Sequence, residues 1–208
     1  MRYVSKNTVN RLPKYLHYLQ DLRQNGLTRT SSSVIAEALG MTASQVRQDL
    51  SAFGNYGAQG YGYDIEKLIA NICEIIGVYQ PHSIAVVGVG CIGRALLEHM
   101  DFTSYNYRVC AAFDIDPNVI GTTINGVQVY SIDVIEEILQ RHRVDICMLT
   151  VSKSAAKSVA SKLNQLKVRG IWNFTNVNLG LDKTETVVEN VDFLDSLLTL
   201  TYYLKKDI

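Results

Sequence analysis

Apolar residues at the start of the chain recur every three or four positions, which is the period of a helix. Residues 9–22 therefore predict an amphipathic helix whose apolar stripe begins at Val9 and which ends at Asn25-Gly26. A second, short helix is predicted over residues 34–39, between a serine-rich stretch that offers N-cap side chains and Gly40.

A third helix is predicted over residues 43–53, because Thr42 and Gln45 have the spacing of a capping box and the apolar residues share one face. Two helices joined by a short turn that contains glycine are typical of a helix-turn-helix. Residues 54–63 then alternate glycine with aromatic residues, which excludes a helix and predicts a twisted β-hairpin. A hairpin in this place would be the wing of a winged helix.

The centre of the chain alternates apolar strands with amphipathic helices. A fourth helix, capped by Asp64, carries a broad apolar stripe, and we expect a domain boundary near Gln80-Pro81. Repeated strand–helix units beyond it indicate a parallel sheet covered on both faces. The strands are expected at 84–87, 109–113, 146–151 and 170–174, the helices after the first strand and at 134–141 and 154–166, and a hairpin at 121–130 around Asn125-Gly126. Ala155, Val159 and Leu163 are predicted to face the sheet.

The last element, residues 191–204, is apolar around nearly its whole circumference. Such a helix must be buried on all sides. We expect a partner subunit to cover it; the alternative is burial between the two domains of its own chain. The predicted fold is thus α/β, with a winged-helix domain (1–80), a Rossmann-like parallel-sheet domain (81–190) and a C-terminal dimerisation helix (191–208).

The strongest chemical motif is a G-x-G-x-x-G sequence between the first strand of the second domain and its helix. Gly88 allows a tight turn, Gly90 allows a pyrophosphate to approach the backbone, and Gly93 allows helix and strand to pack closely. Asp114 ends the next strand, where its carboxylate would bind an adenosine ribose and repel a 2′-phosphate. The predicted nucleotide-binding residues here are Gly88, Val89, Gly90, Cys91, Ile92, Gly93, Arg94 and Asp114. The alternative is a glycine-rich turn that binds no nucleotide.

Charge is distributed unevenly along a chain of 208 residues that is neutral overall. Residues 1–63 contain seven Lys and Arg against three Asp and Glu, a net charge of +4, so residues 64–208 carry −4. This bias suggests a polyanionic partner for the first domain. Its exposed polar residues predict a double-stranded DNA site made of Ser32, Ser44, Gln45, Arg47, Gln48, Ser51, Gln59 and Tyr61. A small helical bundle without a nucleic-acid partner is the alternative.

The sequence gives no sign of a membrane span or signal peptide, so we expect a cytoplasmic protein. Its four cysteines are far apart in the sequence. Cys73, Cys110 and Cys147 are predicted to be buried reduced thiols, and Cys91 lies in the glycine turn. No metal site is expected.

Taken together, these motifs resemble the Rex family of redox-sensing transcriptional repressors over essentially the whole chain. The motifs are Arg11-Leu-Pro, Val46-Arg-Gln-Asp-Leu-Ser, Phe53-Gly-x-x-Gly-x-x-Gly-x-Gly-Tyr63, Gly88-Val-Gly-Cys-Ile-Gly-Arg-Ala-Leu96, Ala112-Phe-Asp-x-Asp-Pro117, Leu149-Thr-Val, Gly170-Ile-x-Asn-Phe174 and Val191-Asp-Phe-Leu194. The resemblance implies a homodimer with exchanged C-terminal helices, a palindromic operator, and NADH and NAD⁺ as competing ligands, with ADP as a further candidate. It also adds Thr150 and Val151 to the nucleotide site.

This chain departs from the family pattern where the family binds DNA and nicotinamide. Gln48 replaces an arginine, and Gly57-Ala-Gln-Gly60 replaces a basic wing. In the resemblance, a redox switch pairs an aspartate, here Asp192, with an arginine at the position of His17 and a tyrosine near His99. Because histidine titrates near neutrality, a His17–Asp192 pair would be weaker than an arginine pair. We therefore expect nucleotide binding with a weakened response to the NADH/NAD⁺ ratio.

Three classes of function follow from this reasoning. The first is a nucleotide-responsive DNA-binding repressor without enzymatic activity. The second is an NAD-dependent oxidoreductase, which needs a substrate pocket and a residue for proton transfer; no segment of the sequence is left for a substrate domain. The third is a nucleotide-gated module that binds another protein through its winged helix.

Overall fold

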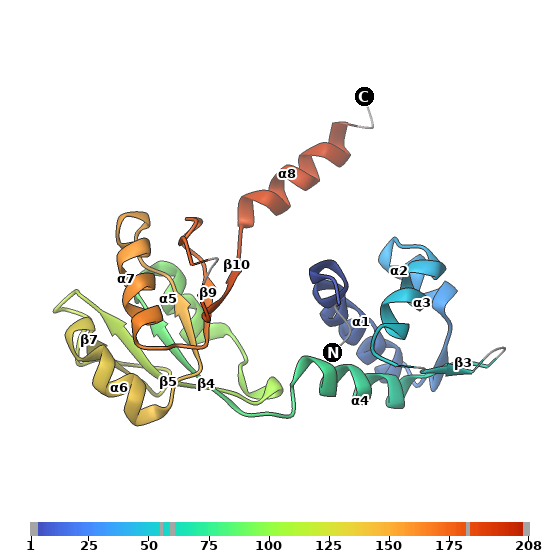
Figure 1. Ribbon diagram of the computed structural model, residues 1–208, viewed down its shortest axis with the longest axis horizontal. Coiled ribbons are helices and arrows are strands. Elements are labelled where there is room, and N and C mark those ends of the chain that lie inside the picture. The colour runs from blue at the N-terminus through green and yellow to red at the C-terminus, as the bar shows by residue number, and fades with distance from the viewer. Residues whose placement is uncertain (1–3, 55, 59–60, 182–183, 206–208) are drawn as a thin grey trace. The chain divides into compact units, whose positions relative to one another are not determined.

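The computed structural model describes residues 4–54, 56–58, 61–181 and 184–205. The chain forms two compact units, 1–80 and 81–208 (Figure 1). The N-terminal unit combines four helices with a three-stranded antiparallel sheet of order β1-β3-β2. Its elements are α1 (Lys6–Gln24), β1 (Arg29–Thr30), α2 (Ser32–Leu39), α3 (Ala43–Ser51), β2 (Gly57–Ala58), β3 (Gly62–Asp64) and α4 (Ile65–Ile76).

Local capping signals set the ends of these helices, as the sequence predicts. The hydroxyl of Thr42 accepts a hydrogen bond from the backbone N–H of Gln45, which starts α3, and the carboxylate of Asp64 accepts one from Lys67 to start α4. Gly40 ends α2 in the left-handed conformation, with φ +64°. The helix-turn-helix and the hairpin of β2 and β3 are confirmed as structural elements.

The C-terminal unit is built around a seven-stranded sheet of order β10-β9-β8-β4-β5-β7-β6, in which, among the described strands, only the β6–β7 pair is antiparallel. Its strands are β4 (His82–Val87), β5 (Tyr107–Asp114), β6 (Thr123–Ile124), β7 (Val127–Ser131), β8 (Ile146–Leu149), β9 (Gly170–Asn173) and β10 (Val187–Asn190). Its helices are α5 (Cys91–His99), α6 (Ile135–His142), α7 (Lys153–Gln165) and α8 (Phe193–Leu204), with 3₁₀ turns at Thr103–Tyr105 and Ile132–Val134.

Helices cover the two faces of this sheet with separate apolar cores. On one face, α6 and α7 bury Ile135, Ile138 and Leu163 against the sheet. On the other face, Leu97 of α5 and Phe102 pack against Ile84, Val86 and Met148. The predicted Rossmann-like arrangement is therefore present, including the hairpin at Asn125-Gly126.

Several sequence predictions are wrong in detail. Val9 is exposed, and Thr8 takes the buried position in the stripe of α1. In α7, Leu163 is buried and Val159 packs partly buried against the same core, as predicted, whereas the buried alanines are Ala156 and Ala160 instead of Ala155. The third helix ends at Ser51 instead of residue 53, the strand β8 ends at Leu149 instead of residue 151, and the edge strand β10 was not predicted.

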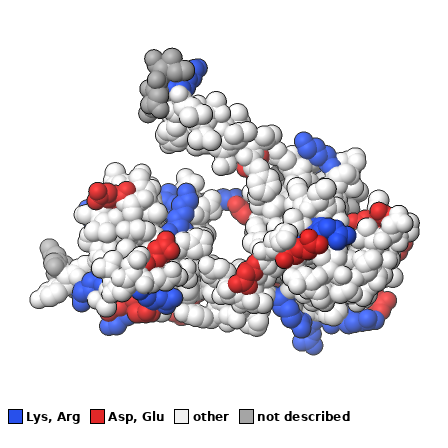
Figure 2. Space-filling view, turned by 180° about the vertical axis from the view of Figure 1, so that it is seen from behind, with Lys and Arg blue, Asp and Glu red and all other residues white. Residues whose placement is uncertain are grey.

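Helix α8 leaves the C-terminal unit with its apolar side chains exposed to solvent. Its leucines, tyrosines and Phe193 are each more than half exposed. The surface of α8 that is visible in Figure 2 is almost free of charged side chains. At its base, the ring of Phe193 lies 6.4 Å from Phe174, whose ring in turn lies 4.6 Å from Trp172. The prediction of a helix that is apolar all round is confirmed, and the rest of the C-terminal unit leaves its surface uncovered.

All four cysteine thiols are free. Cys73 and Cys147 are buried, Cys91 is exposed, and Cys110 is half-buried instead of fully buried as predicted. Across the described part of the chain, no helix is both long and apolar enough to cross a membrane.

Candidate nucleotide and DNA sites

The glycine loop lies at the carboxyl edge of the parallel sheet, directly after β4. The strand β4 pairs with β5 on one side and with β8 on the other, so the strand order reverses at this point. In open α/β sheets, ligands bind outside the carboxyl ends of the strands at such a reversal. The topology therefore places the loop where a nucleotide would bind.

The three glycines of the loop differ in what surrounds them. A Cβ on Gly88, whose φ is +96°, would lie 2.9 Å from the backbone of Thr150, and one on Gly93 would lie 2.0 Å from the carbonyl oxygen of Gly88. A Cβ on Gly90 would have no atom within 4 Å. Gly88 and Gly93 are thus required by the packing of the backbone, while Gly90 leaves open space in front of α5.

The first turn of α5 presents backbone N–H groups to this space. Gly90 occupies the N-cap position, and within the described residues no side chain caps the helix. The N–H groups of Cys91, Ile92 and Gly93 therefore remain available to an anion, and the helix dipole favours one there. Arg94 follows with an exposed side chain, 3.5 Å from Glu98.

Thr150, in the loop after β8, holds the glycine loop in place. Its hydroxyl lies 2.6 Å from the carbonyl oxygen of Gly88 and donates to it, and its N–H donates to Val87 at 2.9 Å. The next residue, Val151, is half-buried. Both residues lie beside the glycine loop, and their contact with a nucleotide stays a prediction.

Asp114 ends β5 next to the glycine loop. One carboxylate oxygen accepts a hydrogen bond from the N–H of Val89 at 2.5 Å, and the other accepts from Ile115 at 2.7 Å and Asp116 at 2.9 Å. A carboxylate has about four acceptor positions. Three backbone bonds hold the side chain and leave an acceptor position for a ribose hydroxyl.

A cavity of about 1130 Å³ lies at the other end of the strands. Its lining includes the first residues of five strands, His82, Tyr107, Ile146, Gly170 and Val187. It is therefore separate from the glycine loop, which follows the carboxyl end of β4.

On the DNA side, α3 exposes Ser44, Arg47, Gln48 and Ser51, while Gln45 is half-buried. The guanidinium of Arg47 donates a hydrogen bond at 3.1 Å to the hydroxyl of Ser32, in the first turn of α2. The structure thus brings the predicted Ser32 and Arg47 together across the helix-turn-helix. The hydroxyl of Ser51 donates to the carbonyl of Gln48 and so stays close to its own helix.

The wing is attached to β1 by a residue that the sequence analysis missed. The guanidinium of the exposed Arg29 donates at 3.1 Å to the carbonyl oxygen of Tyr61, whose own side chain is 73% exposed. Arg29 adds a cation beside the wing. Its position in the basic first segment was the one feature of the sequence that could have indicated a role in binding DNA. The predicted Gln59 lies outside the described residues.

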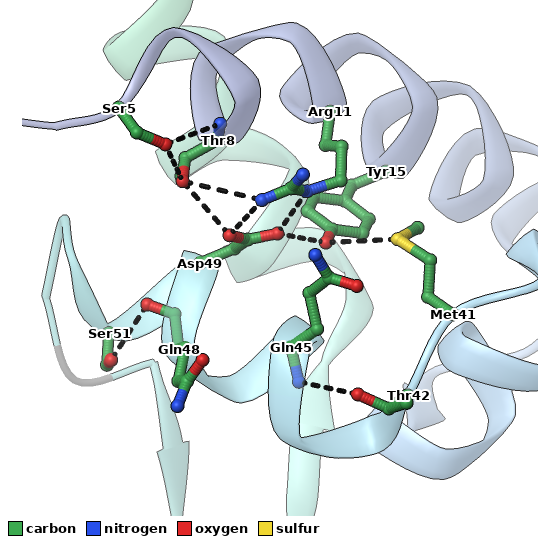
Figure 3. Close-up of polar contacts among 10 residues, drawn as sticks. All are labelled: Ser5, Thr8, Arg11, Tyr15, Met41, Thr42, Gln45, Gln48, Asp49 and Ser51. Carbon is green, nitrogen blue, oxygen red and sulfur yellow. Dashed lines mark hydrogen bonds and ion pairs between the residues drawn. The ribbon is translucent and has the colours of Figure 1, made fainter.

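A buried carboxylate joins α3 to α1 (Figure 3). Asp49 is 4% exposed and accepts hydrogen bonds from Thr8 Oγ1 at 3.1 Å, Tyr15 Oη at 2.6 Å, and Arg11 Nε and Nη2 at 2.6 and 2.7 Å. We call Thr8, Arg11, Tyr15 and Asp49 the Asp49 cluster. Arg11 and Asp49 lie within motifs of the sequence, but their contact was not predictable from it, because nothing in a sequence shows which residues 38 positions apart will meet.

Hydrogen bonding outweighs burial in setting the protonation of this cluster. Burial raises the pKa of Asp49, but the hydrogen bonds from Arg11, Tyr15 and Thr8 lower it below its usual value overall. Burial and the hydrogen bond to Asp49 raise the pKa of Tyr15. The pair is therefore ionised carboxylate and neutral phenol at physiological pH.

The three predicted switch residues contact different groups. His99 Nε2 lies 3.8 Å from Glu98 at the end of α5. Asp192 caps α8, since its carboxylate accepts from the N–H of Leu194 at 2.8 Å and of Asp195 at 3.3 Å. His17 is exposed on α1, in the other unit.

Two family models match separate parts of the chain. Residues 3–51 match a model described as "Putative DNA-binding protein N-terminus", and residues 79–177 match one described as "CoA binding domain". The first contains the helix-turn-helix and the second contains the glycine loop.

Curated relatives match nearly the whole chain. The redox-sensing transcriptional repressor Rex of Clostridium novyi (strain NT) is 41% identical over 98% of this chain and 96% of its own length. The protein of the same name from Clostridium botulinum (strain Hall) is 40% identical with the same coverage.

Solved structures of a Rex-family repressor, RSP, superpose on the full chain. The complex of RSP with β-NAD⁺ and operator DNA has a TM-score of 0.91 at 35% identity and covers 100% of this chain and 95% of RSP. The complex with β-NADH has a TM-score of 0.92 at 33% identity, covering 100% and 97%.

The geometry of the glycine loop predicts that Gly90→Ala abolishes nucleotide binding without unfolding the protein. The new methyl group meets no protein atom but occupies the space in front of α5. Isothermal titration calorimetry with NADH should show at least about a tenfold loss of affinity, or 1.4 kcal/mol, at an unchanged melting temperature. Gly93→Ala is the control: its methyl group would collide with Gly88, so this variant should melt at a lower temperature. Unchanged NADH affinity in Gly90→Ala would contradict the assignment.

The lowered pKa of Asp49 predicts how acid affects the N-terminal unit. A group whose pKa is lower in the folded state contributes stability above its unfolded pKa, about 3.9, and loses it as the pH falls through the folded value. Asp49→Asn should therefore lower the free energy of unfolding at neutral pH by about 1–3 kcal/mol, and its difference from wild type should shrink in acid. Urea denaturation followed by circular dichroism measures this, with Asp21→Asn, an exposed aspartate of α1, as the control. A constant difference at every pH would show that Asp49 is not the titrating group.

Proposed function

The chain belongs to the Rex family of redox-sensing transcriptional repressors, and we propose from this premise that it represses transcription by binding an operator and releases it when NADH replaces NAD⁺. The N-terminal unit is the DNA-binding domain, and the C-terminal unit binds NAD(H), with ADP as a further candidate ligand that shares the adenosine contacts. Since the related proteins are repressors, the family favours this function over the oxidoreductase and the protein-interaction module.

One observation supports the proposal most strongly: a single chain holds both halves of such a switch. The helix-turn-helix with its wing lies in residues 1–80, and the glycine loop with Asp114 lies in residues 81–208. RSP, which this chain resembles over its full length, has been solved with operator DNA, with β-NAD⁺ and with β-NADH.

The DNA contacts are assigned to α3 and the wing. Gln48 is exposed next to Arg47 and has the bidentate geometry that suits adenine. Arg47 is exposed and donates a hydrogen bond to Ser32 in the first turn of α2, and helix N-termini commonly contact DNA phosphates. Tyr61 and the neighbouring Arg29 would contact the DNA backbone beside the wing.

The active form is a homodimer whose apolar helices α8 are covered by the partner chain. Eight large side chains of α8 are more than half exposed in one chain, and a soluble protein rarely leaves so large an apolar surface uncovered. A dimer presents two winged helices and so binds a palindromic operator. It acts in the cytoplasm, where a bacterial operator is located.

The redox response is expected to be weak in this member of the family. NADH and NAD⁺ share every adenosine contact, so a ligand-driven change needs a difference at the nicotinamide end. Moving a 1:99 equilibrium to 99:1 takes about a 10⁴-fold preference. His17 and His99 stand where the family pattern has an arginine and a tyrosine, and both are weaker partners for Asp192 than those residues.

Titration of a complex between the protein and its operator tests the function and the strength of its response. We expect NADH to release the DNA at a lower concentration than NAD⁺ does, and we expect the ratio of the two half-release concentrations to be modest. His17→Arg, which restores the permanent charge of the family pattern at this position, should enlarge that ratio. Sharp release by NADH alone with inert NAD⁺ in the wild type would show an intact switch, and no binding to any genomic duplex would refute the repressor assignment.

Asp114 is expected to select NADH over NADPH. Asp114→Ala removes a charged hydrogen-bond acceptor for the ribose and a charge that repels a 2′-phosphate, so NADH should bind more weakly by about 1.5–3 kcal/mol and the gap to NADPH should narrow. Calorimetry with both nucleotides measures this. Asp116→Ala, an exposed acid in the same loop, is the control and should change neither affinity. A wild type that prefers NADPH would contradict the assignment of Asp114.

A further inference from the structure

We propose that the Asp49 cluster positions the recognition helix α3 on α1 and so determines how well the protein distinguishes its operator from other DNA. This inference rests on the proposed function, since it assumes that α3 enters the major groove. It assigns Thr8, Arg11, Tyr15 and Asp49 as positioning residues that do not themselves touch DNA.

The donors of the cluster fix α3 in two directions. Thr8, Arg11 and Tyr15 follow one another at helical spacing on a single face of α1, and all of them donate to one carboxylate. Because the donors span two turns of α1, they oppose both rotation of α3 about its axis and sliding of α3 along α1. The planar guanidinium of Arg11 adds a bidentate contact, which further limits the angle of the carboxylate.

Asp49 lies next to the residues assigned to DNA contact. Figure 3 shows Asp49 directed toward α1 and Gln48 directed away from it. Gln48 precedes Asp49 and Arg47 precedes Gln48, so any shift of the Asp49 backbone moves both side chains. Tyr15 also lies 3.7 Å from the sulfur of Met41, in the turn between α2 and α3, so the same hydroxyl contacts both parts of the helix-turn-helix.

The energetics favour a role in geometry over one in stability. Val46 and Leu50 already bury the inner face of α3, and apolar burial is non-directional. Hydrogen bonds, in contrast, weaken steeply when their angles change. A buried ion pair often contributes no more stability than apolar residues of similar volume. An apolar replacement of the cluster should therefore keep the domain folded while removing the directional restraint.

The experiment compares operator preference in the full-length protein. The operator is selected from a random duplex library by the wild type, and the dissociation constants for it and for a scrambled duplex are measured at one salt concentration. The apolar variant Arg11→Met/Tyr15→Phe/Asp49→Leu should keep the melting temperature and the NADH affinity of the wild type. Its preference for the operator, measured as the dissociation constant for the scrambled duplex divided by that for the operator, should fall at least about tenfold. A fall of this size corresponds to the effect of one mismatched base pair. Arg23→Met, which removes an exposed cation elsewhere on α1, should leave the ratio unchanged.

Tyr15→Phe keeps the test decisive if the triple variant does not fold. It removes one hydrogen bond while the Arg11–Asp49 pair remains, and a smaller loss of preference is expected at a nearly unchanged melting temperature. A purely structural role would lower both DNA affinities together and leave their ratio constant, which would overturn the positioning role. A wild type without preference for any duplex would instead contradict the proposed function.

Discussion

The C-terminal unit depends on one close approach of backbone to backbone. Between the ends of β4 and β8, Gly88 and Gly93 pack against each other and against Thr150 with no room for a side chain. This contact sets the direction of α5 and leaves its first N–H groups facing open space at Gly90. The close packing of strand and helix therefore creates the nucleotide site. Asp114 is held to the same loop because its carboxylate accepts a hydrogen bond from the N–H of Val89.

The helices that carry the functional residues are held in position by different interactions in the two units. In the C-terminal unit the restraint is steric, since hydrogen-bonded strands and buried glycines leave little freedom. In the N-terminal unit, a polar cluster around Asp49 supplies the direction that the apolar packing of α3 on α1 lacks. A ligand-responsive repressor needs a restraint in each unit, because a change at the nucleotide affects DNA binding only if the DNA-contacting residues start from a defined position.

Local signals made most of the fold predictable from the sequence. The glycine loop, the Asn125-Gly126 hairpin and the caps at Thr42 and Asp64 depend on neighbouring residues, and each is present in the structure. The errors came from contacts distant in the chain. Thr8 is buried in place of Val9 because Asp49 lies opposite it. The unpredicted β10 has a mostly exposed sequence and exists because it pairs with β9. The site residues at the glycine loop were accessible to sequence reasoning for the same local reason, whereas the Asp49 cluster was not.

The position of Trp172 has a consequence for spectroscopy. It is the single tryptophan of the chain, and the N-terminal unit contains none. Its ring lies against Phe174, which contacts Phe193 at the base of α8. Fluorescence excited selectively at tryptophan therefore reports on the C-terminal unit and the root of its last helix, while the DNA-binding unit gives no signal. The intrinsic emission of this protein can follow coverage of α8 without any added label.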